Sequence, residues 1–148
     1  SYKNAELTKS GTVGASGALD LSATGKAVSF PYVNTSFNIT MAAWIKFNST
    51  LGTNRILKHM NCMIDLIDGS FRWMPNIDNG PEGMAYTVQN NTWYRVVISQ
   101  AANSTYNFYV NGVLVRNNAV RVISTTNTYG TGYIGGFNSG GQFNGSID

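Results

Sequence analysis

The chain has 148 residues, of which 43% are hydrophobic and 11% are charged, with a formal net charge of +3. This length is enough to bury a core within one domain, and no stretch approaches the roughly 18 consecutive apolar residues of a membrane helix. The ten basic residues are scattered from Lys3 to Arg121 without a run. We therefore expect neither a nucleic acid nor membrane insertion among its interactions.

The first 16 residues are rich in small polar side chains and are predicted to form an N-terminal arm or edge element, with a short strand at 5–8. The remainder, 17–148, is predicted to be one domain. Alternating apolar and polar residues there indicate strands rather than helices. The expected strands span 18–21, 27–30, 39–47, 55–58, 62–67, 70–74, 84–88, 93–99, 106–110, 113–116, 120–124 and 131–134.

Two dipeptides between these strands indicate tight hairpins. Asn111-Gly112 separates two alternating apolar runs, and Asp68-Gly69 separates two others. The type I′ turn requires positive φ at both central residues, which Asn and Asp tolerate and Gly adopts freely. The chain therefore reads as an antiparallel all-β protein, with neutral turns supplied by its 18 Asn and 16 Gly residues.

Several segments carry a family resemblance in the expected order. They are Trp93-Tyr94-x-Val96, Tyr109-Val110-Asn111-Gly112, the strand ITMAAWIK at 39–46, and FNGSID at 143–148. Together they resemble concanavalin A-like lectin and laminin-G-like (LamG) modules over about 17–148. The resemblance implies a two-sheet antiparallel β-sandwich of the jelly-roll type. Such sandwiches serve sugar binding, adhesion, catalysis and structural roles, so the site requires a separate argument.

The resemblance also implies strands that this sequence lacks. Such modules continue beyond the segment that ends here at Asp148, and they begin with a strand before the region of Ala5. By this resemblance one or both terminal strands are expected to be missing from the sandwich, which predicts an unpaired sheet edge. An unpaired edge accepts another strand, including one from a second copy of the chain.

The residues around the three tryptophans and the single cysteine indicate whether these side chains are buried. Trp44 and Trp93 lie in largely apolar runs and are interpreted as core residues, while Trp73 stays open between the core and a ligand platform. Cys62, the only cysteine, is expected to pack as a small buried hydrophobe. His59 is three residues away, but no orienting partner is visible, so cysteine catalysis is not expected.

Carboxylates are too few and too poorly placed to predict an enzyme. A glycosidase on this scaffold needs two carboxylates about 5 to 9 Å apart. Glu6 and Glu82 are the only glutamates, and Asp65 and Asp68 straddle a turn, which puts them out of phase on the sheet. We therefore expect a non-catalytic protein.

Sugar recognition requires aromatic rings for stacking and polar side chains for hydroxyl groups. Two loop regions offer both. The ligand-binding candidates are Trp73, Asn76, Asp78, Asn79, Tyr86, Asn127, Tyr129, Asn138 and Gln142.

The resemblance further implies a possible Ca²⁺ site, because family members commonly bind calcium near the closing strand. Its candidate ligands are Asp20, Asp78 and Asp148, although no contiguous run of oxygen ligands supports them. Six sequons could carry N-linked sugars in a eukaryotic or viral protein. They begin at Asn34, Asn38, Asn48, Asn90, Asn103 and Asn144.

Two functions remain open at this point. The first is a lectin-like module, extracellular or on a virion surface, that binds a glycan or glycoprotein. The alternative is a structural subunit of a surface filament, sheath or capsid that assembles with copies of itself through an unpaired sheet edge.

Overall fold

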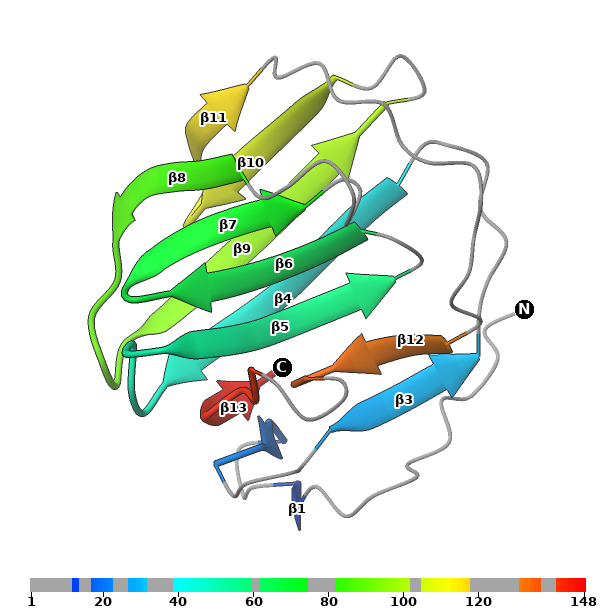
Figure 1. Ribbon diagram of the computed structural model, residues 1–148, viewed down its shortest axis with the longest axis vertical. Helices are drawn as coiled ribbons and strands as arrows, with labels where there is room; N and C mark the ends of the chain where they lie inside the picture. The colour runs from blue at the N-terminus through cyan, green and yellow to red at the C-terminus, as the bar shows by residue number, and fades with distance from the viewer. Residues whose placement is uncertain are drawn as a thin grey trace.

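The computed structural model describes residues 12–13, 17–22, 27–31, 39–59, 62–74, 82–101, 105–117, 131–136 and 141–148. Every regular element in these ranges is a β-strand. The strands form two antiparallel sheets that lie one behind the other (Figure 1). The two-sheet sandwich predicted from the sequence is therefore confirmed. No helix suited to crossing a bilayer occurs within these ranges.

The sheet at the back of Figure 1 contains seven strands in the order β1-β2-β13-β4-β9-β10-β11. Its long central strands are β4 and β9, which pair along eight successive residue pairs from Ile39↔Gln100 to Lys46↔Trp93. The strand bounds are β1 Thr12–Val13, β2 Leu19–Asp20, β4 Ile39–Phe47, β9 Trp93–Gln100, β10 Tyr106–Val110, β11 Val113–Asn117 and β13 Gly145–Ile147.

The sheet at the front contains six strands in the order β3-β12-β5-β6-β7-β8. Consecutive hairpins connect β5, β6, β7 and β8, whereas β12 pairs with β3 and β5, which are distant from it in the chain. The strand bounds are β3 Val28–Pro31, β5 Thr53–His59, β6 Cys62–Ile67, β7 Ser70–Met74, β8 Glu82–Thr87 and β12 Thr131–Ile134.

Both predicted hairpin turns have the expected backbone. Asn111 and Gly112 have φ angles of 51° and 81°, and Val110 pairs with Val113 across them. Asp68 and Gly69 have φ angles of 45° and 79° between β6 and β7. Positive φ at both central residues matches the right-handed twist of the strands, so these turns were predictable from the dipeptides alone.

Several strand bounds differ from those expected. β5 begins at Thr53, two residues earlier, and β8 begins at Glu82 rather than at Met84. Pairing with neighbouring strands extends both beyond their apolar residues. The expected strands at 5–8 and 120–124 lie outside the described residues, whereas β1 shows that part of the predicted arm is an edge strand paired with β2.

Aromatic rings from both sheets fill the space between them. Phe71 of β7 is fully buried, and its ring centroid lies 5.8 Å from that of Phe108 of β10 and 6.1 Å from that of Phe47 of β4. These separations are typical of favourable aromatic pairs. Because β10 and β4 belong to one sheet and β7 to the other, these contacts hold the two layers together.

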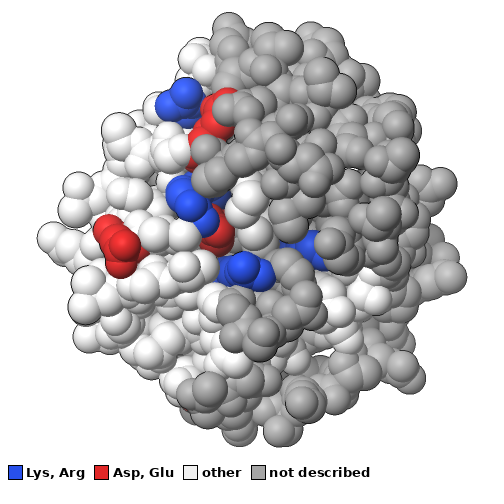
Figure 2. Space-filling model, in the orientation of Figure 1, with Lys and Arg blue, Asp and Glu red and all other residues white. Residues whose placement is uncertain are grey.

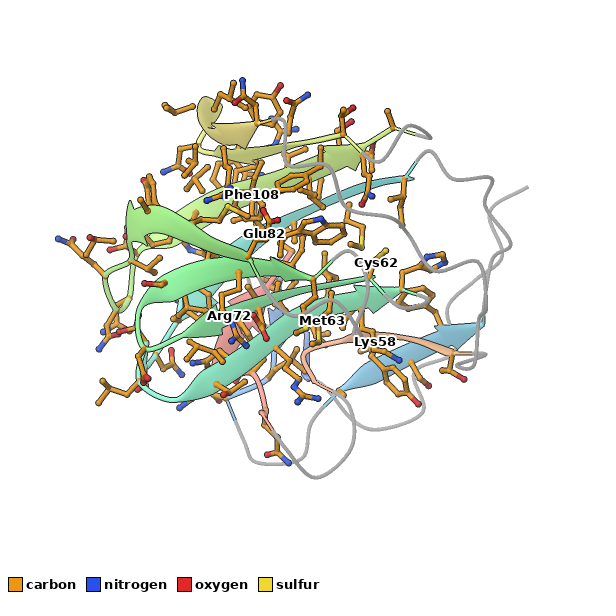
Figure 3. All side chains as sticks on the ribbon, turned by 45° about the horizontal axis from the view of Figure 1, so that its top comes forward. Lys58, Cys62, Met63, Arg72, Glu82 and Phe108 are labelled. Atoms are coloured by element: carbon orange, nitrogen blue, oxygen red, sulfur yellow. The ribbon has the colours of Figure 1, made fainter. Side chains whose placement is uncertain are left out.

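A polar contact also joins the sheets at their β8 and β11 edges. The Tyr106 hydroxyl donates to a Glu82 carboxylate oxygen, and Arg116 Nε lies 3.3 Å from the same oxygen. Burial, followed by the contact with Glu82, raises the pKa of Tyr106. The phenol therefore remains a neutral donor, and Glu82, which lies on β8 of the six-stranded sheet (labelled in Figure 3), is held by two residues of the seven-stranded sheet.

The closing strand β13 is an interior strand, not an edge. It lies between β2 and β4, and its pairing with β4 extends to Trp44 and Asp148 through two backbone hydrogen bonds of 2.7 and 2.8 Å. Beyond Trp44, no strand of the described chain pairs with β4 on this side. Within the described ranges, residues 39–43 of β4 therefore have a strand partner only on the β9 side.

Gly145 allows β13 to approach β4. A Cβ atom at this position would overlap the carbonyl oxygen of Lys46, so no larger residue fits without moving the strand. We expect Gly145→Ala to lower the free energy of unfolding by on the order of 2 kcal/mol. Urea unfolding followed by far-UV circular dichroism measures this change.

Gly83→Ala is the matched control, since a Cβ atom at Gly83 would have no neighbour within 4 Å. Its effect should stay within about 0.5 kcal/mol. Equal effects of the two substitutions would contradict the role assigned to the close approach at Gly145.

Candidate functional site

Two tryptophans predicted to lie in the core are exposed on the outer face of the seven-stranded sheet. Trp44 is 46% exposed and Trp93 is 36% exposed. The core prediction for both was therefore wrong. The reason is the alternation of strand residues: Met41, Ala43 and Ile45 of β4 point inward, which turns Trp44 outward.

The sequence contained a signal that could have revealed this orientation. Trp44 is in phase with Thr40 and Lys46 along β4, and Trp93 is in phase with Arg95 along β9. Polar residues at alternate positions mark the solvent face of a strand. The apolar character of tryptophan outweighed that signal in the prediction.

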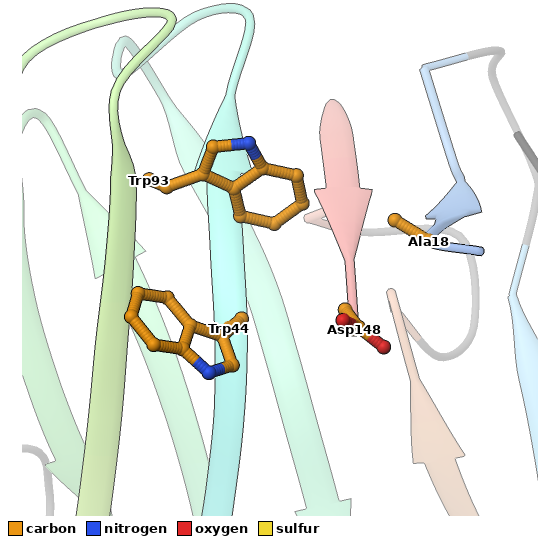
Figure 4. A pocket seen from close by; sticks show the side chains of 4 residues that line it. All are labelled: Ala18, Trp44, Trp93 and Asp148. Atoms are coloured by element: carbon orange, nitrogen blue, oxygen red, sulfur yellow. The ribbon is translucent and has the colours of Figure 1, made fainter. Parts of the chain in front are cut away.

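The register of β4 and β9 brings the two indoles together. Trp44 pairs with Arg95, and Lys46 pairs with Trp93, so the tryptophans are diagonal neighbours on one face, within reach of each other for aromatic side chains. Figure 4 shows the rings side by side over these strands. They line a shallow pocket of about 390 Å³ with Ala18 and Asp148, called here the tryptophan pocket.

The other wall of the pocket comes from β2 and the residue after β13. Ser146 pairs with Asp20 and Ile147 with Leu19, which places Asp148 beside Ala18. Two backbone hydrogen bonds join Asp148 to Trp44, so the two residues are side by side in the sheet and both line the pocket. Residues more than 100 positions apart in the sequence thus form one site.

Charges of opposite sign flank the indoles. Lys46 Nζ lies 5.4 Å from the Trp93 ring centroid, a cation–π contact, and the exposed Arg95 lies across from Trp44. Asp148 lies on the opposite side, toward β2. A molecule resting on Trp44 therefore meets hydrogen-bond acceptors on one side and donors on the other.

The sequence-predicted loop site is only partly described, and two of its aromatic candidates, Trp73 and Tyr86, lie away from the tryptophan pocket. Trp73 is fully buried with its ring centroid 6.4 Å from that of Tyr106, so of the two interpretations left open for Trp73 its position favours the core. Tyr86 is half-buried on β8, where its ring packs against those of Phe71 and Tyr94. It belongs to the six-stranded sheet, whereas the tryptophan pocket lies on the seven-stranded sheet.

Of the remaining loop candidates, Gln142 is the one in the described part of the chain. Gln142 is half-buried in the segment that leads into β13. The other candidates lie outside the described residues, and their role stays a prediction. They are Asn76, Asp78, Asn79, Asn127, Tyr129 and Asn138.

The predicted calcium ligands give only two neighbouring carboxylates. Asp20 and Asp148 lie on the outer face of adjacent strands, and Asp20 Oδ1 accepts a 2.9 Å hydrogen bond from the Ser22 N–H. The third candidate, Asp78, lies outside the described residues. Within the described ranges, no three His, Cys, Asp or Glu side chains cluster as metal ligands. Two carboxylates fall short of the six to eight oxygens that Ca²⁺ takes.

Three of the six predicted sequons lie in described positions at one end of the sandwich. Asn48 Nδ2 donates to Asn144 Oδ1 at 3.3 Å, and Asn90 Oδ1 accepts from the Thr50 N–H at 2.9 Å. A sugar on Asn48 would be attached to the same Nδ2 atom that donates the first of these bonds. Asn34, Asn38 and Asn103 lie outside the described residues. The attachment of sugars to any of the six sequons stays a prediction.

One ion pair within the six-stranded sheet joins Asp65 of β6 to Arg72 of β7. Arg72 holds Asp65 through two hydrogen bonds of 2.8 and 3.0 Å, and Asp65 is almost fully buried. Figure 2 shows acidic and basic residues interspersed among the described residues of this face. The Asp65 carboxylate is thus held by a structural ion pair.

A second buried group lies at the end of the β5–β6 hairpin, where Lys58, Cys62 and Met63 gather (Figure 3). His59 and Cys62 are cross-strand partners there, and the His59 ring stacks on Phe30 with centroids 6.1 Å apart. Lys58 Nζ lies 5.7 Å from the Tyr133 ring centroid. Burial and then the charge of Arg55 lower the pKa of Lys58.

The buried position of Cys62 confirms its interpretation as a small hydrophobe. Burial raises the pKa of its thiol to about 12, which keeps the reactive thiolate scarce. We expect no reaction of the folded protein with Ellman's reagent at about pH 8, and stoichiometric reaction in concentrated guanidinium chloride. Rapid reaction of the folded protein would contradict this burial.

Tryptophan fluorescence tests the corrected positions of the indoles. Acrylamide should quench Trp44 and Trp93 readily, because both are exposed, and Trp73 slowly, because it is fully buried. The double variant Trp44→Phe, Trp93→Phe should therefore retain a blue-shifted emission that acrylamide barely quenches. Efficient quenching of this variant would place Trp73 at the surface instead.

Known proteins resemble this chain in sequence family and in fold. The family model of the concanavalin A-like lectin/glucanases superfamily matches residues 22–148. No curated protein sequence matches the chain. Solved structures do match, at sequence identities that establish a shared fold alone.

One similar structure is a protein of Bacteroides ovatus ATCC 8483 that is provisionally named a carbohydrate binding protein, with a TM-score of 0.66 and 20% identity over 81% of this chain and 38% of that one. A second is the botulinum neurotoxin serotype D ligand binding domain in complex with N-acetylneuraminic acid, with a TM-score of 0.63 and 17% identity over 88% and 36%. A third is the Trypanosoma rangeli sialidase, with a TM-score of 0.68 and 15% identity over 88% and 24%.

The chain thus spans well under half the length of each of these proteins. Its fold is lectin-like, and the same fold occurs in a structure that contains a sialidase. With the family model matched over most of its length, the chain belongs to the concanavalin A-like lectin/glucanases superfamily.

Proposed function

We propose that this chain is a non-catalytic carbohydrate-binding module and that the tryptophan pocket is its sugar site. The observation that carries the proposal is the exposure of two adjacent indoles beside a carboxylate. Leaving two large aromatic rings in water forgoes the favourable burial that such side chains provide, and adjacent exposed aromatics mark binding surfaces. The solved structures named for carbohydrate binding support the same class of ligand.

The chemistry of the pocket fits a pyranose ring. An indole face packs against the apolar C–H groups of a sugar, and a carboxylate or guanidinium forms hydrogen bonds with its hydroxyl groups. Trp44, Asp148 and Arg95 supply these three groups across neighbouring strands. Lys46 already contacts the Trp93 ring, so Trp44 is the more available stacking surface.

Asp148 in the pocket and Asp20 beside it on β2 are poorly suited to glycoside hydrolysis. A general acid for that reaction occupies apolar surroundings that keep it protonated. Asp148 is exposed, and Asp20 accepts a hydrogen bond from a backbone N–H. These surroundings favour binding over catalysis.

The proposed setting is a cell or virion surface, where immunogold labelling of the intact source would locate the protein.

A glycan array tests the sugar site directly. Binding by the folded chain should fall at least about tenfold in Trp44→Ala, because a stacked aromatic ring contributes on the order of 1 kcal/mol or more beyond area burial. Trp93→Ala should weaken binding as well. Leu51→Ala is the control, since Leu51 is 79% exposed and does not line the pocket.

The array is run with calcium and again with a chelator. Binding at the tryptophan pocket should persist in both. Unchanged affinity in Trp44→Ala and Trp93→Ala would exclude this pocket as the site. Loss of binding with chelator alone would contradict the metal-independent site proposed here.

A second candidate function rests on a different observation, the unpaired part of β4. Because Trp44 N–H and C=O point toward β13, those of Ala42 and Thr40 point to the same side. Beside them lies a pocket of about 310 Å³ lined largely by Phe30, Met41, Leu57 and Ile134. Backbone groups next to apolar side chains suit an added strand from a second copy, as in a structural subunit.

Ala42→Pro tests this second function, because proline removes an N–H that points away from β9. Analytical ultracentrifugation of the parent chain should show concentration-dependent assembly, and the variant should stay monomeric while retaining a cooperative melting transition. A parent chain that is monomeric at all concentrations would contradict the structural-subunit function.

A further inference from the structure

The outer face of the seven-stranded sheet continues past the tryptophan pocket toward β10 and β11. The residue pairs define rows across the strands. One row contains Trp44, Arg95 and Asn111, with Arg95 N–H donating to Asn111 Oδ1 at 2.9 Å. In the next row Val97 pairs with Ala42 on one side and with Tyr109 on the other.

Tyr109 points to this outer face. Its chain neighbours Phe108 and Val110 are fully buried in the core, which turns the half-buried Tyr109 outward by alternation. Leu114, its partner on β11, is 44% exposed. The outer face therefore carries a third aromatic ring, with the short side chains of Ala42 and Val97 between it and Trp44.

On ideal strand geometry, the distance between Tyr109 and Trp44 exceeds the width of one sugar ring. Tyr109 lies two strands and two residues from Trp44, so two interstrand spacings of about 4.8 Å and two residue rises of about 3.4 Å put their Cα atoms about 12 Å apart. A single pyranose cannot contact both. The exposed Arg95 lies between them, with guanidinium donors directed to solvent.

From this arrangement we propose an extended site in which Tyr109 forms a second sugar platform, so that the ligand is an oligosaccharide of several units. The inference rests on the proposed function of the tryptophan pocket. The first sugar stacks on Trp44 beside Asp148, Arg95 donates hydrogen bonds to hydroxyl groups of the units that follow, and a further unit packs on Tyr109.

Affinity as a function of ligand length tests the second platform. The probes are glucose, mannose, galactose and N-acetylglucosamine, each as the monosaccharide and as linear oligomers up to the hexasaccharide. Isothermal titration calorimetry of the parent chain should give at least a tenfold higher affinity for the hexasaccharide of the preferred sugar than for its monosaccharide.

Tyr109→Ala should remove most of this gain while leaving the monosaccharide affinity unchanged. Tyr109→Phe should retain the gain, because it keeps the ring. Leu114→Ala, which alters a neighbouring exposed apolar side chain, should also retain it. Thermal melting of each variant confirms that the fold is intact.

Two results would overturn the extended site. One is equal affinity of the parent chain for the monosaccharide and hexasaccharide, and the other is a length gain that survives in Tyr109→Ala. Either result leaves the proposed sugar site at the tryptophan pocket standing if Trp44→Ala still weakens binding. Absence of binding to every probe at either length would instead remove the proposed function and the extended site together.

Discussion

The antiparallel pairing of β4 with β9 is the constraint on which both the core and the candidate site depend. Along eight residue pairs, side chains on one face enter the aromatic core and those on the other face solvent. A shift of one residue would exchange the two sets. Phe47, Ile45 and Val96 require burial, so their packing fixes Trp44 and Trp93 on the outside.

The exposed tryptophans thus have a physical explanation that does not require a ligand, but their neighbours do not follow from packing alone. Asp148 reaches Trp44 because β13 inserts between β2 and β4, and the close approach at Gly145 makes that insertion possible. A carboxylate, two indoles and two cationic side chains come from strands that meet only in the folded chain. This convergence distinguishes a site from a scatter of exposed aromatics.

The charged residues of the two sheets differ in whether they are paired within the protein or exposed at its surface. On the six-stranded sheet, Asp65 and Arg72 satisfy each other in a largely buried pair, and between the sheets Glu82 accepts from Tyr106 and contacts Arg116. Removing one member of such a pair would leave an uncompensated charge. On the seven-stranded sheet, the charges around the tryptophan pocket lie at the surface, where they remain available to a ligand.

The sequence by itself determined the fold class, the family resemblance and both tight hairpins, because alternation and turn dipeptides act over a few residues. It also contained the orientation of Trp44, through its phase with Thr40 and Lys46, although the apolar neighbours of the indole obscured it. Tertiary structure alone decided that Trp44, Trp93 and Asp148 meet, and that Trp73 does not join them. The reason is that strand order and register depend on contacts between distant segments, which no local pattern encodes.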